Sequence, residues 1–388
     1  MQAPLDTDVL VIGAGPTGLT IAALLASRGI RNIVIDRIAE GANTSRAAVV
    51  HARTLEVLER IGAAERLVSL GIRADRFTIR DRDRVLVPVR FDELPTRYPY
   101  TLMVSQATTE AVLLERLVEL GARVLRPRSL VDLNQDADSV CAVLDDGTRL
   151  RARFVIGADG MHSTVRDKAG IAFTGASYAE SFVLADVRLT GRVPHDEVIL
   201  YFSPAGLVVV APLPGGVHRI VATVDEAPEH PGIGFVQALL NERGAQHEPA
   251  HVDALVWSSR FRVHHRVADR YRAGRIVLAG DAAHVHSPAG GQGMNTGIQD
   301  GVALADALVA ALACGDSRPL DAYAEARRPV ARQVVALADR LTRLATARRA
   351  MRPWRNAALR LLARIPAFRR RLAWQLSGLV YRAGEAGR

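Results

Sequence analysis

Residues 8–18 read Asp-Val-Leu-Val-Ile-Gly-Ala-Gly-Pro-Thr-Gly, an apolar run that ends in a glycine-rich turn. A nearly continuous apolar run is typical of a buried parallel strand. The pattern of residues 16–28 predicts the helix that follows, and Ile33–Asp36 reads as a second parallel strand. The chain therefore opens with a predicted βαβ unit, which favours an α/β fold.

Gly13, Gly15 and Gly18 give this turn the spacing G-x-G-x-x-G. The first glycine permits the tight turn, the second lets the backbone approach a pyrophosphate, and the third lets the helix pack on the strand. The N–H groups at the start of the helix can bind phosphates. Asp36 follows Gly13 by 23 residues, where it can accept hydrogen bonds from a ribose. The motif predicts a dinucleotide site without separating NAD from FAD, and a glycine turn without a ligand is the alternative.

The bulk composition is that of a globular enzyme-sized protein. At 388 residues the chain fits about two domains, taking ~150 residues for each. The two cysteines, Cys141 and Cys314, offer neither a disulfide framework nor a thiolate metal site. The first residues show no signal peptide, and no apolar run near them is long enough to span a membrane. We expect a cytoplasmic protein.

The net charge of +9 is carried almost entirely by arginine, since Lys168 is the only lysine. The excess lies after Arg340, and the chain has no helix-turn-helix, zinc or aromatic-interleaved basic motif. We therefore expect a small-molecule substrate, no nucleic-acid partner, no transmembrane segment, and a monomer or homodimer. Residues 359–374 mix apolar residues with arginine and could touch a membrane or an acidic carrier protein. Helices packed on the first lobe with their arginines in water are the plainer interpretation.

The pattern of elements changes between Phe173 and Tyr271, where short alternating strands are separated by Gly/Pro turns and one helix is predicted at 234–242. The α/β pattern returns with a buried strand at 275–279 and a long helix from about 293 to 313. The first lobe is therefore interrupted in sequence by a second, mixed or antiparallel sheet. We expect the first lobe to comprise 1–72, 106–172 and 273–350, the second 73–105 and 173–272, and basic helices to fill 351–388.

Three further segments carry motifs that are more specific than the first glycine turn. Residues 157–166 read Gly-Ala-Asp-Gly-Met-His-Ser-Thr-Val-Arg, residues 277–284 read Val-Leu-Ala-Gly-Asp-Ala-Ala-His, and residues 288–295 read Pro-Ala-Gly-Gly-Gln-Gly-Met-Asn. With these motifs in this order, the chain closely resembles the FAD-dependent aromatic hydroxylases with the para-hydroxybenzoate hydroxylase fold. It is most similar to the phenol-hydroxylase-related enzymes that oxygenate polyketides and other aromatic natural products. The resemblance covers essentially the whole chain. Some relatives continue into a thioredoxin-like domain, which we expect this chain to lack.

The resemblance implies a Rossmann-like FAD-binding lobe of the GR2 type interleaved with a substrate lobe, followed by C-terminal helices. It also implies a role for each matching residue. The pyrophosphate would lie on Gly13, Gly15, Pro16, Thr17 and Gly18, the adenosine ribose on Asp36 and Arg37, adenine on the backbone of Leu130, and the ribityl chain on Gly280 and Asp281. Arg46 would meet the FAD beside the flavin, Gln106 would bind its linker, and Asp159 and Gly160 would serve both FAD and the nicotinamide coenzyme. The isoalloxazine ring would lie along Pro288, Gly291, Gln292, Gly293, Met294 and Asn295.

The chemistry of residues 288–295 can be argued independently. Reduced flavin carries negative charge around N1 and the C2 carbonyl, so its site must stabilise an anion. Gly290, Gly291 and Gly293 can expose backbone N–H groups, and the helix that begins there presents the positive end of its dipole. One such terminus contributes about 0.3–1 kcal/mol when exposed and up to ~2 kcal/mol when partly buried. A glycine loop with a purely structural role is the alternative.

The implied activity is a monooxygenation. NADH or NADPH would reduce FAD, O2 would add to give a flavin hydroperoxide, and one oxygen atom would pass to a substrate between the lobes. Since there is no second G-x-G-x-x-G, the coenzyme would bind transiently in a groove. Arg46, Arg53 and Arg166 could pair with its phosphates, although Arg53 reads better as a solvated helix-face arginine. The sequence does not identify a catalytic residue.

Other candidates have plainer interpretations beside the functional one. Tyr201, Phe202 and His218 could line the substrate pocket or simply pack in the sheet. His284 and His286 lack a third ligand, so we expect no metal site and expect His284 to fix its loop by hydrogen bonds. His51 reads as a surface or satisfied histidine, and Ser163 as a helix N-cap.

Three rival functions stay open. Baeyer–Villiger insertion, epoxidation or oxidative inactivation of an antibiotic would use the same cofactor motifs. An FAD-binding protein that does not oxygenate is the rival from another class. An NAD dehydrogenase would not need the segments around Asp159 and Asp281.

Overall fold

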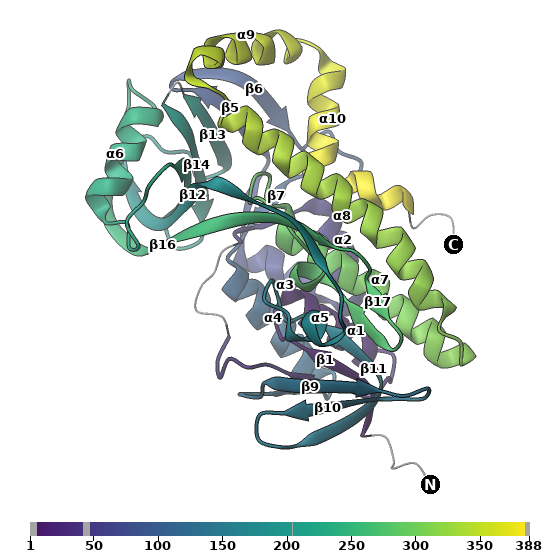
Figure 1. Ribbon diagram of the computed structural model, residues 1–388. Coiled ribbons are helices and arrows are strands. Elements are labelled where there is room, and N and C mark those ends of the chain that lie inside the picture. The colour runs from purple at the N-terminus through teal and green to yellow at the C-terminus, as the bar shows by residue number, and fades with distance from the viewer. Residues whose placement is uncertain (1–5, 42–46, 204, 385–388) are drawn as a thin grey trace.

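The computed structural model describes residues 6–41, 47–203 and 205–384, which form two large sheets, a small third sheet and flanking helices (Figure 1). The first large sheet has the order β17-β18-β11-β1-β2-β8, with β10 and β9 added on β11. Its central pairs are parallel, whereas β9, β10 and β11 pair antiparallel. The strands are β1 (Thr7–Ile12), β2 (Asn32–Ile35), β8 (Val124–Leu125), β9 (Leu130–Gln135), β10 (Val140–Leu144), β11 (Arg149–Gly157), β17 (Arg272–Ala273) and β18 (Ile276–Leu278).

Helices cover this sheet and share its apolar core. They are α1 (Pro16–Ala26), α2 (Ala52–Leu58), η1 (Glu59–Ile61), α3 (Ala63–Leu70), α4 (Gln106–Glu119), α5 (Thr164–Lys168), η2 (Gly280–Ala282), α7 (Gln292–Cys314) and α8 (Arg318–Ala345). Among the described residues, α7 alone has the length and hydropathy of a membrane span, and 61% of that window is buried. Such burial is expected of a core helix that packs against α1, α2 and α8.

The second large sheet has the order β19-β16-β12-β15-β14-β13-β5-β6 and is antiparallel except between β13 and β5. Helix α6 (Ile233–Arg243) covers one face. The strands are β5 (Arg76–Asp81), β6 (Arg84–Arg90), β12 (Phe173–Thr190), β13 (Glu197–Ser203), β14 (Gly206–Leu213), β15 (Val217–Val224), β16 (His251–Ala268) and β19 (His284–Val285). Through β19, this sheet reaches the residues just before the 288–295 segment.

The third sheet has the order β3-β7-β4 and packs against both large sheets. Its strands are β3 (Val49–Val50), β7 (Thr101–Met103) and β4 (Ile72–Ala74). Ala48, Met103 and Ala74 pack with Val198 and Ala211 of the second sheet. The small sheet therefore holds residues 48–50 against the second lobe.

The C-terminal segment folds into η3 (Arg349–Met351), α9 (Arg352–Leu362), α10 (Pro366–Leu376) and η4 (Leu379–Gly384). Leu359, Ala373 and Leu376 pack with Leu86 and Val89 of β6. The expectation that these helices pack on the first lobe is therefore wrong for α9 and α10, because the apolar face of β5 and β6 offers them a larger partner. The end of α10 and η4 contact the first lobe, α10 through the Leu376 carbonyl oxygen, which accepts from Gln292, and η4 at α2.

The α/β fold with a Rossmann-like lobe, a second sheet and C-terminal helices is confirmed. The second sheet differs in detail from the sequence prediction. β12 and β16 are each 18 residues long, whereas the pattern predicted only 182–189 and 254–263. Register shifts interrupt their pairing, so the alternation of apolar residues that marks a strand breaks in mid-strand. β5 and β6 were not predicted, since their arginines and Pro88 obscure the strand pattern.

Glycines allow α1 and α7 to cross closely. A Cβ on Gly297 would lie 2.5 Å from Thr17 Oγ1, and one on Gly301 would lie 3.1 Å from the Thr17 carbonyl oxygen. A Cβ on Gly280 would meet the same hydroxyl at 2.6 Å. Thr17 therefore fits between two glycines, and Gly293, Gly297 and Gly301 repeat every fourth residue along α7. This spacing on one helix face was a readable signal that the sequence interpretation did not use.

We predict that Gly297→Val lowers the free energy of unfolding by about 1–3 kcal/mol, the usual cost of overpacking a filled site. Gly234→Ala in α6 is the matched control, because a Cβ added there would have nothing within 4 Å and alanine is the better helix former. Urea unfolding should show the two variants shifting in opposite directions. Equal stability of Gly297→Val and the parent chain would contradict the close crossing.

Candidate cofactor site

The turn between β1 and α1 contains three glycines with different constraints. Gly13 has φ of +104°, and a Cβ there would lie 2.3 Å from the Ala158 carbonyl oxygen. A Cβ on Gly18 would lie 1.9 Å from the Gly13 carbonyl oxygen. Gly15, in contrast, has an ordinary extended conformation and nothing within 4 Å of its Cβ position. The fold requires Gly13 and Gly18, whereas Gly15 keeps space open beside the backbone.

That open space faces the start of α1. The helix begins at Pro16 with Gly15 as its N-cap, and no side chain caps it. The N–H groups of its first turn therefore retain the capacity to bind an anion. Asp36, at the end of β2, accepts hydrogen bonds from the N–H groups of Ala14 (2.6 Å) and Ile38 (2.8 Å). Each oxygen keeps a further acceptor position, which suits a ribose diol.

A second uncapped helix begins nearby. α7 starts at Gln292, its N-cap Gly291 is left-handed with φ of +63°, and no side chain caps it. Because Thr17 of α1 packs between Gly280 and Gly297, the N-terminal halves of α1 and α7 lie against one another. Gly280 opens η2, which also carries the exposed Asp281. The geometry gathers two positive helix termini and a carboxylate around one stretch of open backbone.

The residues 288–293, which we call the ring loop, are held by side chains from elsewhere. The Asn295 amide donates to the carbonyl oxygens of Val49 (3.0 Å) and Gly291 (2.8 Å), and its oxygen accepts from the His51 N–H (2.8 Å). Gln292 donates to the carbonyl oxygens of Gly290 (3.3 Å) and Leu376 (3.1 Å). The side-chain amides of Gln292 and Asn295 thus bind protein backbone and hold the ring loop.

His51 is a member of this site that sequence reasoning missed. Its Nε2 donates to the Gly290 carbonyl oxygen at 3.0 Å, and the side chain is buried. Burial lowers the pKa of His51 to about 4, against the opposing effect of the hydrogen bonds to Gly290 and Gly291. His51 is therefore a neutral donor at pH 7. Because Gly290 lies 239 residues further along the chain, no local pattern could have identified this contact.

His286 precedes the ring loop and donates from Nδ1 to the Ser287 carbonyl oxygen at 2.8 Å. Burial lowers its pKa to about 4 as well. His284 bonds through Nε2 to Asp300 of α7 at 2.6 Å, and Arg327 of α8 donates to the other oxygen of Asp300 at 2.6 Å. The expectation that His284 fixes its loop by hydrogen bonds is confirmed.

The remaining predicted cofactor residues occupy different positions around this groove. Asp159 accepts from Ser163 Oγ (2.5 Å) and the Val165 N–H (3.1 Å), and burial raises its pKa. Ser163 caps α5, as expected. Gly160 has a φ of +82° with open space at its Cβ position. Gln106 accepts from the Ala47 N–H at 3.3 Å.

Four further predicted cofactor residues lie at the edges of this groove or of the ring loop. Leu130 is buried at the start of β9, and Arg37 is exposed beside Asp36. Pro288 and Met294 are half-buried at the two ends of the ring loop. Arg46 lies outside the described residues.

Two arginines proposed for the coenzyme phosphates are already engaged. Arg166 is buried, donates to the Ala282 carbonyl oxygen at 3.2 Å and lies 4.1 Å from the centre of the Phe173 ring. Arg53 is also buried rather than solvated, and it donates to Glu56 at 3.0 Å. Neither suits a transient phosphate in a surface groove. Both expectations for Arg53, as a coenzyme partner and as a solvated arginine, are wrong because the C-terminal segment covers α2.

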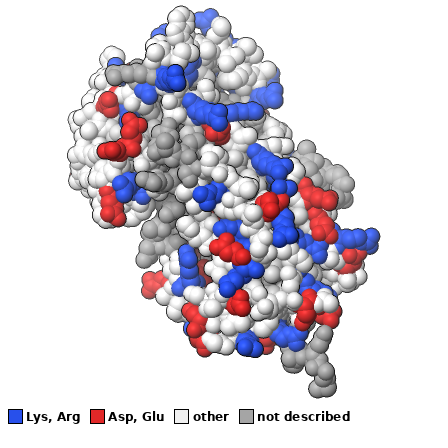
Figure 2. All heavy atoms as spheres, viewed as in Figure 1, with Lys and Arg blue, Asp and Glu red and all other residues white. Residues whose placement is uncertain are grey.

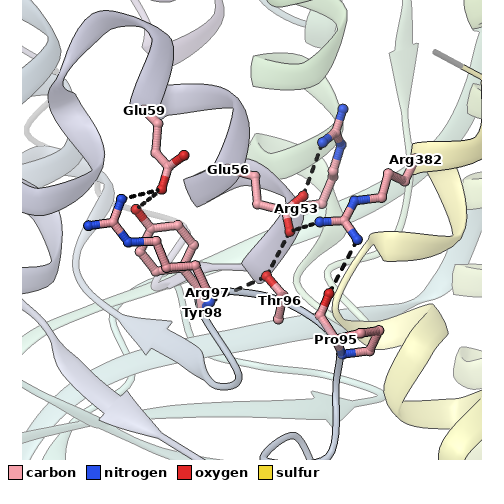
Figure 3. A network of polar contacts seen from close by, with 8 residues as sticks. All are labelled: Arg53, Glu56, Glu59, Pro95, Thr96, Arg97, Tyr98 and Arg382. Atoms are coloured by element: carbon pink, nitrogen blue, oxygen red, sulfur yellow. Dashed lines mark hydrogen bonds and ion pairs between the residues drawn. The ribbon is translucent and has the colours of Figure 1, made fainter. Parts of the chain in front are cut away.

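Glu56 is the centre of that covering contact, which Figure 3 shows. Besides Arg53, its carboxylate accepts hydrogen bonds from Thr96 Oγ1 at 2.6 Å and Arg382 at 2.5 Å. Arg382 also donates to the Pro95 carbonyl oxygen at 3.3 Å. The network joins α2, the segment between β6 and β7, and η4, so the C-terminal segment is fixed next to the ring loop.

One buried ion pair joins the second sheet to the cofactor side. Arg219 of β15 makes two bonds to Asp186 of β12, at 2.7 and 2.8 Å, and donates to the Ala47 carbonyl oxygen at 2.9 Å. Since side chains alternate along a strand, Asp186 and Arg219 face away from α6, toward the first lobe. Phe182 of β12 and Phe261 of the neighbouring β16 stack on the same face, with ring centres 5.8 Å apart.

Two of the three predicted substrate residues, Tyr201 and His218, lie on the opposite face. Tyr201 packs in the apolar core under α6, and His218 shares its strand face with Ile220 and Ala222 of that core. Phe202 points to the other face but is covered by the C-terminal helices, where Arg355 lies 4.8 Å from its ring centre. All three are buried. Because side chains alternate between the two faces of a strand, the register of each strand determines which face a residue occupies. That register could not be set from sequence alone.

FAD fits the residues that are present. Open space beside Gly15 admits a pyrophosphate, Asp36 has acceptors for the ribose, and the uncapped start of α7 can stabilise charge on an electron-rich ring. Comparison with known proteins agrees with this fit. A family model described as "FAD binding domain" matches residues 6–338.

Similar proteins include 6-methylpretetramide 4-monooxygenase of Streptomyces rimosus, 40% identical over 89% of this chain. The match spans 63% of that relative's length, so the chain covers less than two-thirds of it. p-Nitrophenol 4-monooxygenase from Pseudomonas putida matches with a TM-score of 0.86 and 25% identity over 100% of both chains. Aklavinone-11 hydroxylase, solved with FAD and aklavinone, matches with a TM-score of 0.77 and 28% identity over 89% of this chain and 70% of its own.

The neutral state of His51 makes stability depend on pH. The pKa of His51 is about 4 in the folded protein, against an ordinary value of 6.5 that applies to the unfolded chain. Between these two pH values the unfolded chain therefore binds a proton that the folded chain does not. Stability should therefore fall as the pH drops from 6.5 toward 4. Between pH 7 and pH 5 the free energy of unfolding of the parent chain should fall. We predict that His51→Asn makes this fall smaller by about 2 kcal/mol. Urea unfolding at both pH values measures it.

The matched control is His230→Asn, since His230 is exposed and remote from the ring loop. This substitution should leave the pH dependence unchanged. The same pH dependence in His51→Asn and the parent chain would show that His51 is not held neutral by the fold.

Proposed function

Since the chain belongs to the family with the FAD binding domain, we propose that it is an FAD-dependent monooxygenase that uses NADH or NADPH and O2. Its substrate would be an aromatic, polyketide-type compound that gains one hydroxyl group. The observation that carries this proposal is the close crossing of α1 and α7, in which Thr17 packs between Gly280 and Gly297 and both helices begin without a side-chain cap. The names of the similar proteins, which include a pretetramide monooxygenase and an aklavinone hydroxylase, support the choice of substrate class.

When bound, FAD supplies the chemistry that accepts a hydride from the coenzyme and activates O2. The protein's part is positioning and charge stabilisation. The N–H groups near Gly291 and the dipole of α7 favour negative charge at the ring by up to ~2 kcal/mol in a partly buried geometry. Asn295 and His51 hold the ring loop so that these donors need no rearrangement.

The second sheet would supply the substrate side of the site. Phe182 and Phe261 offer a stacked aromatic surface, and Phe261 is only partly buried. Flat aromatic ligands pack well on such surfaces. The Asp186–Arg219 pair lies on the same face and binds the Ala47 carbonyl oxygen, so it would fix the distance between substrate wall and cofactor. We propose this face as the wall of the pocket, in place of Tyr201, Phe202 and His218.

A Gly15→Val substitution should separate cofactor binding from folding. The backbone at Gly15 is extended and its Cβ position is open, so valine should fit the empty protein but collide with a pyrophosphate. We predict unchanged stability of the cofactor-free protein and FAD affinity about 10- to 100-fold weaker, the equivalent of roughly 1–3 kcal/mol of overpacking. Fluorescence titration with FAD measures the affinity.

Gly232→Val is the matched control for this experiment. Gly232 is also an extended N-cap with nothing within 4 Å, but it starts α6 in the other lobe. Its FAD affinity should equal that of the parent chain. If both variants bound FAD equally weakly, or if both bound it as tightly as the parent chain, Gly15 would not be part of the cofactor site.

The oxygenation itself is tested with a panel of phenols and polycyclic polyketides. We predict that at least one compound stimulates NADH or NADPH oxidation by the FAD-loaded protein, and that its product gains one oxygen atom from isotopically labelled O2. The position of the new oxygen distinguishes ring hydroxylation from epoxidation or Baeyer–Villiger insertion. Ligand binding with no coenzyme consumption and no oxygen gain would instead support a non-oxygenating flavoprotein.

A further inference from the structure

Helix α9 buries two polar side chains together with Leu359 and turns much of its apolar surface outward. It buries Arg355 and Asn356, while Trp354 is 73% exposed and Leu361 is 64% exposed. A surface helix of a globular protein normally turns its apolar stripe to the core and its charges to water. This arrangement leaves part of the apolar surface of α9 without a partner among the described residues.

Hydrogen bonds explain why the polar side chains point inward. Arg355 donates to the carbonyl oxygens of Phe202 and Leu344, both at 2.8 Å. Asn356 donates to Asp81 at 2.8 Å. Because these bonds satisfy polar atoms at the end of β13 and α8, rotating the helix to bury Trp354 would leave them unpaired, at a cost of about 1–3 kcal/mol for each buried group. The fold therefore holds the apolar face outward.

The exposed face continues beyond α9. Of the fourteen exposed large apolar residues in the described chain, six lie between residues 344 and 365: Leu344, Met351, Trp354, Leu361, Leu362 and Ile365. An open surface groove of about 630 Å³ between α8 and α9 is lined mainly by apolar atoms. Concentrated apolar surface of this kind marks an interaction site.

The same region is strongly basic. Residues 340–384 contain twelve arginines and no aspartate or glutamate. Arg340 and Arg343 line this groove beside Trp354, and Arg343, which also pairs with Asp339 at 2.9 Å, keeps 78% of its side chain exposed. α9 lies at the far end of the second lobe, and the surface there is white and blue in the same view (Figures 1 and 2). The occupant must therefore be anionic and apolar at once.

Three kinds of occupant can be compared on charge and shape. A second copy meeting this face through its own would bring two arginine-rich surfaces together, which like-charge repulsion opposes. A nucleic acid would need the arginines but not Leu361, Leu362 or Ile365. A membrane with anionic lipids offers phosphates to the arginines and an acyl boundary to tryptophan and leucine, and it suits a helix at the end of an elongated molecule.

We propose that the face formed by α9 and the end of α8 docks this protein on an anionic lipid surface. Trp354 and Leu361 enter the boundary between headgroups and acyl chains, and Arg340 and Arg343 bind lipid phosphates. The binding is peripheral. It is independent of the proposed reaction, since none of these residues lies in the cofactor site.

The test uses the full chain loaded with FAD and vesicles of phosphatidylcholine alone or mixed 7:3 with phosphatidylglycerol. Sedimentation should show binding to the mixed vesicles, with weaker binding at higher salt. Arg340→Gln with Arg343→Gln should weaken binding about 25-fold, because each arginine near an anionic surface contributes ~1 kcal/mol, or about fivefold. Trp354→Ser with Leu361→Ser should weaken it at least about tenfold, since burying one large apolar side chain is worth ~1.5 kcal/mol or more.

The matched control is Arg123→Gln with Arg149→Gln, which removes two exposed arginines from the first lobe. It should bind like the parent chain, and all variants should retain FAD and their unfolding midpoint, because the changed side chains are exposed. A blue shift of the fluorescence on vesicle binding that disappears in Trp354→Phe would place that residue in the boundary.

Several results would overturn the proposal. One is no binding to the mixed vesicles, or equal binding to phosphatidylcholine alone. A second is an equal loss in the control and the α9 variants. Binding to poly-glutamate but not to vesicles would assign the face to an acidic protein, and a dimer lost in Trp354→Ser with Leu361→Ser would assign it to a second copy.

Discussion

The close crossing of α1 and α7 is the constraint on which the proposed site depends. Thr17 fits between Gly280 and Gly297, so a single added methyl group on either glycine would overlap its hydroxyl. The crossing brings together two helix starts that no side chain caps. Side chains cap α4 at Ser105 and α5 at Ser163, whereas the N–H groups at the starts of α1 and α7 keep the capacity to bind a dinucleotide. Glycine content thus serves two purposes, close packing of the helices and access to the backbone.

The sequence predicted what short-range patterns determine. The βαβ unit, the glycine turn with Asp36, the cap at Ser163 and the start of α7 all depend on residues within one or two elements of each other. The bond between His51 and Gly290 joins residues 239 apart, and the pairing of Arg219 with Asp186 depends on a strand register that bulges alter. A one-residue change of register moves a side chain to the opposite face, which is why Tyr201 and His218 lie under α6.

The C-terminal segment shows a different limit of sequence patterns. The apolar-plus-arginine pattern of residues 359–374 is divided in the structure between the end of α9 and α10, and such a pattern does not say which face of a helix turns inward. The carbonyl oxygens of Phe202 and Leu344 and the carboxylate of Asp81 require donors, and Arg355 and Asn356 supply them. The hydrogen bonds to these acceptors at the end of the second sheet therefore stabilise the fold more than burial of Trp354 would. Only the positions of those acceptors could have revealed it.

The same segment also ends against the ring loop. The carbonyl oxygen of Leu376 accepts from Gln292, that of Ser377 accepts from the Arg53 N–H, and Arg382 binds Glu56. A short stretch of chain, 352–384, thus contains both the exposed face of α9 and contacts that support the cofactor loop. Because α10 packs on β6 between them, the two ends form one packed body with the second sheet. The C-terminal helices are therefore part of the structure that sets the geometry of the site, although none of their side chains needs to touch a substrate.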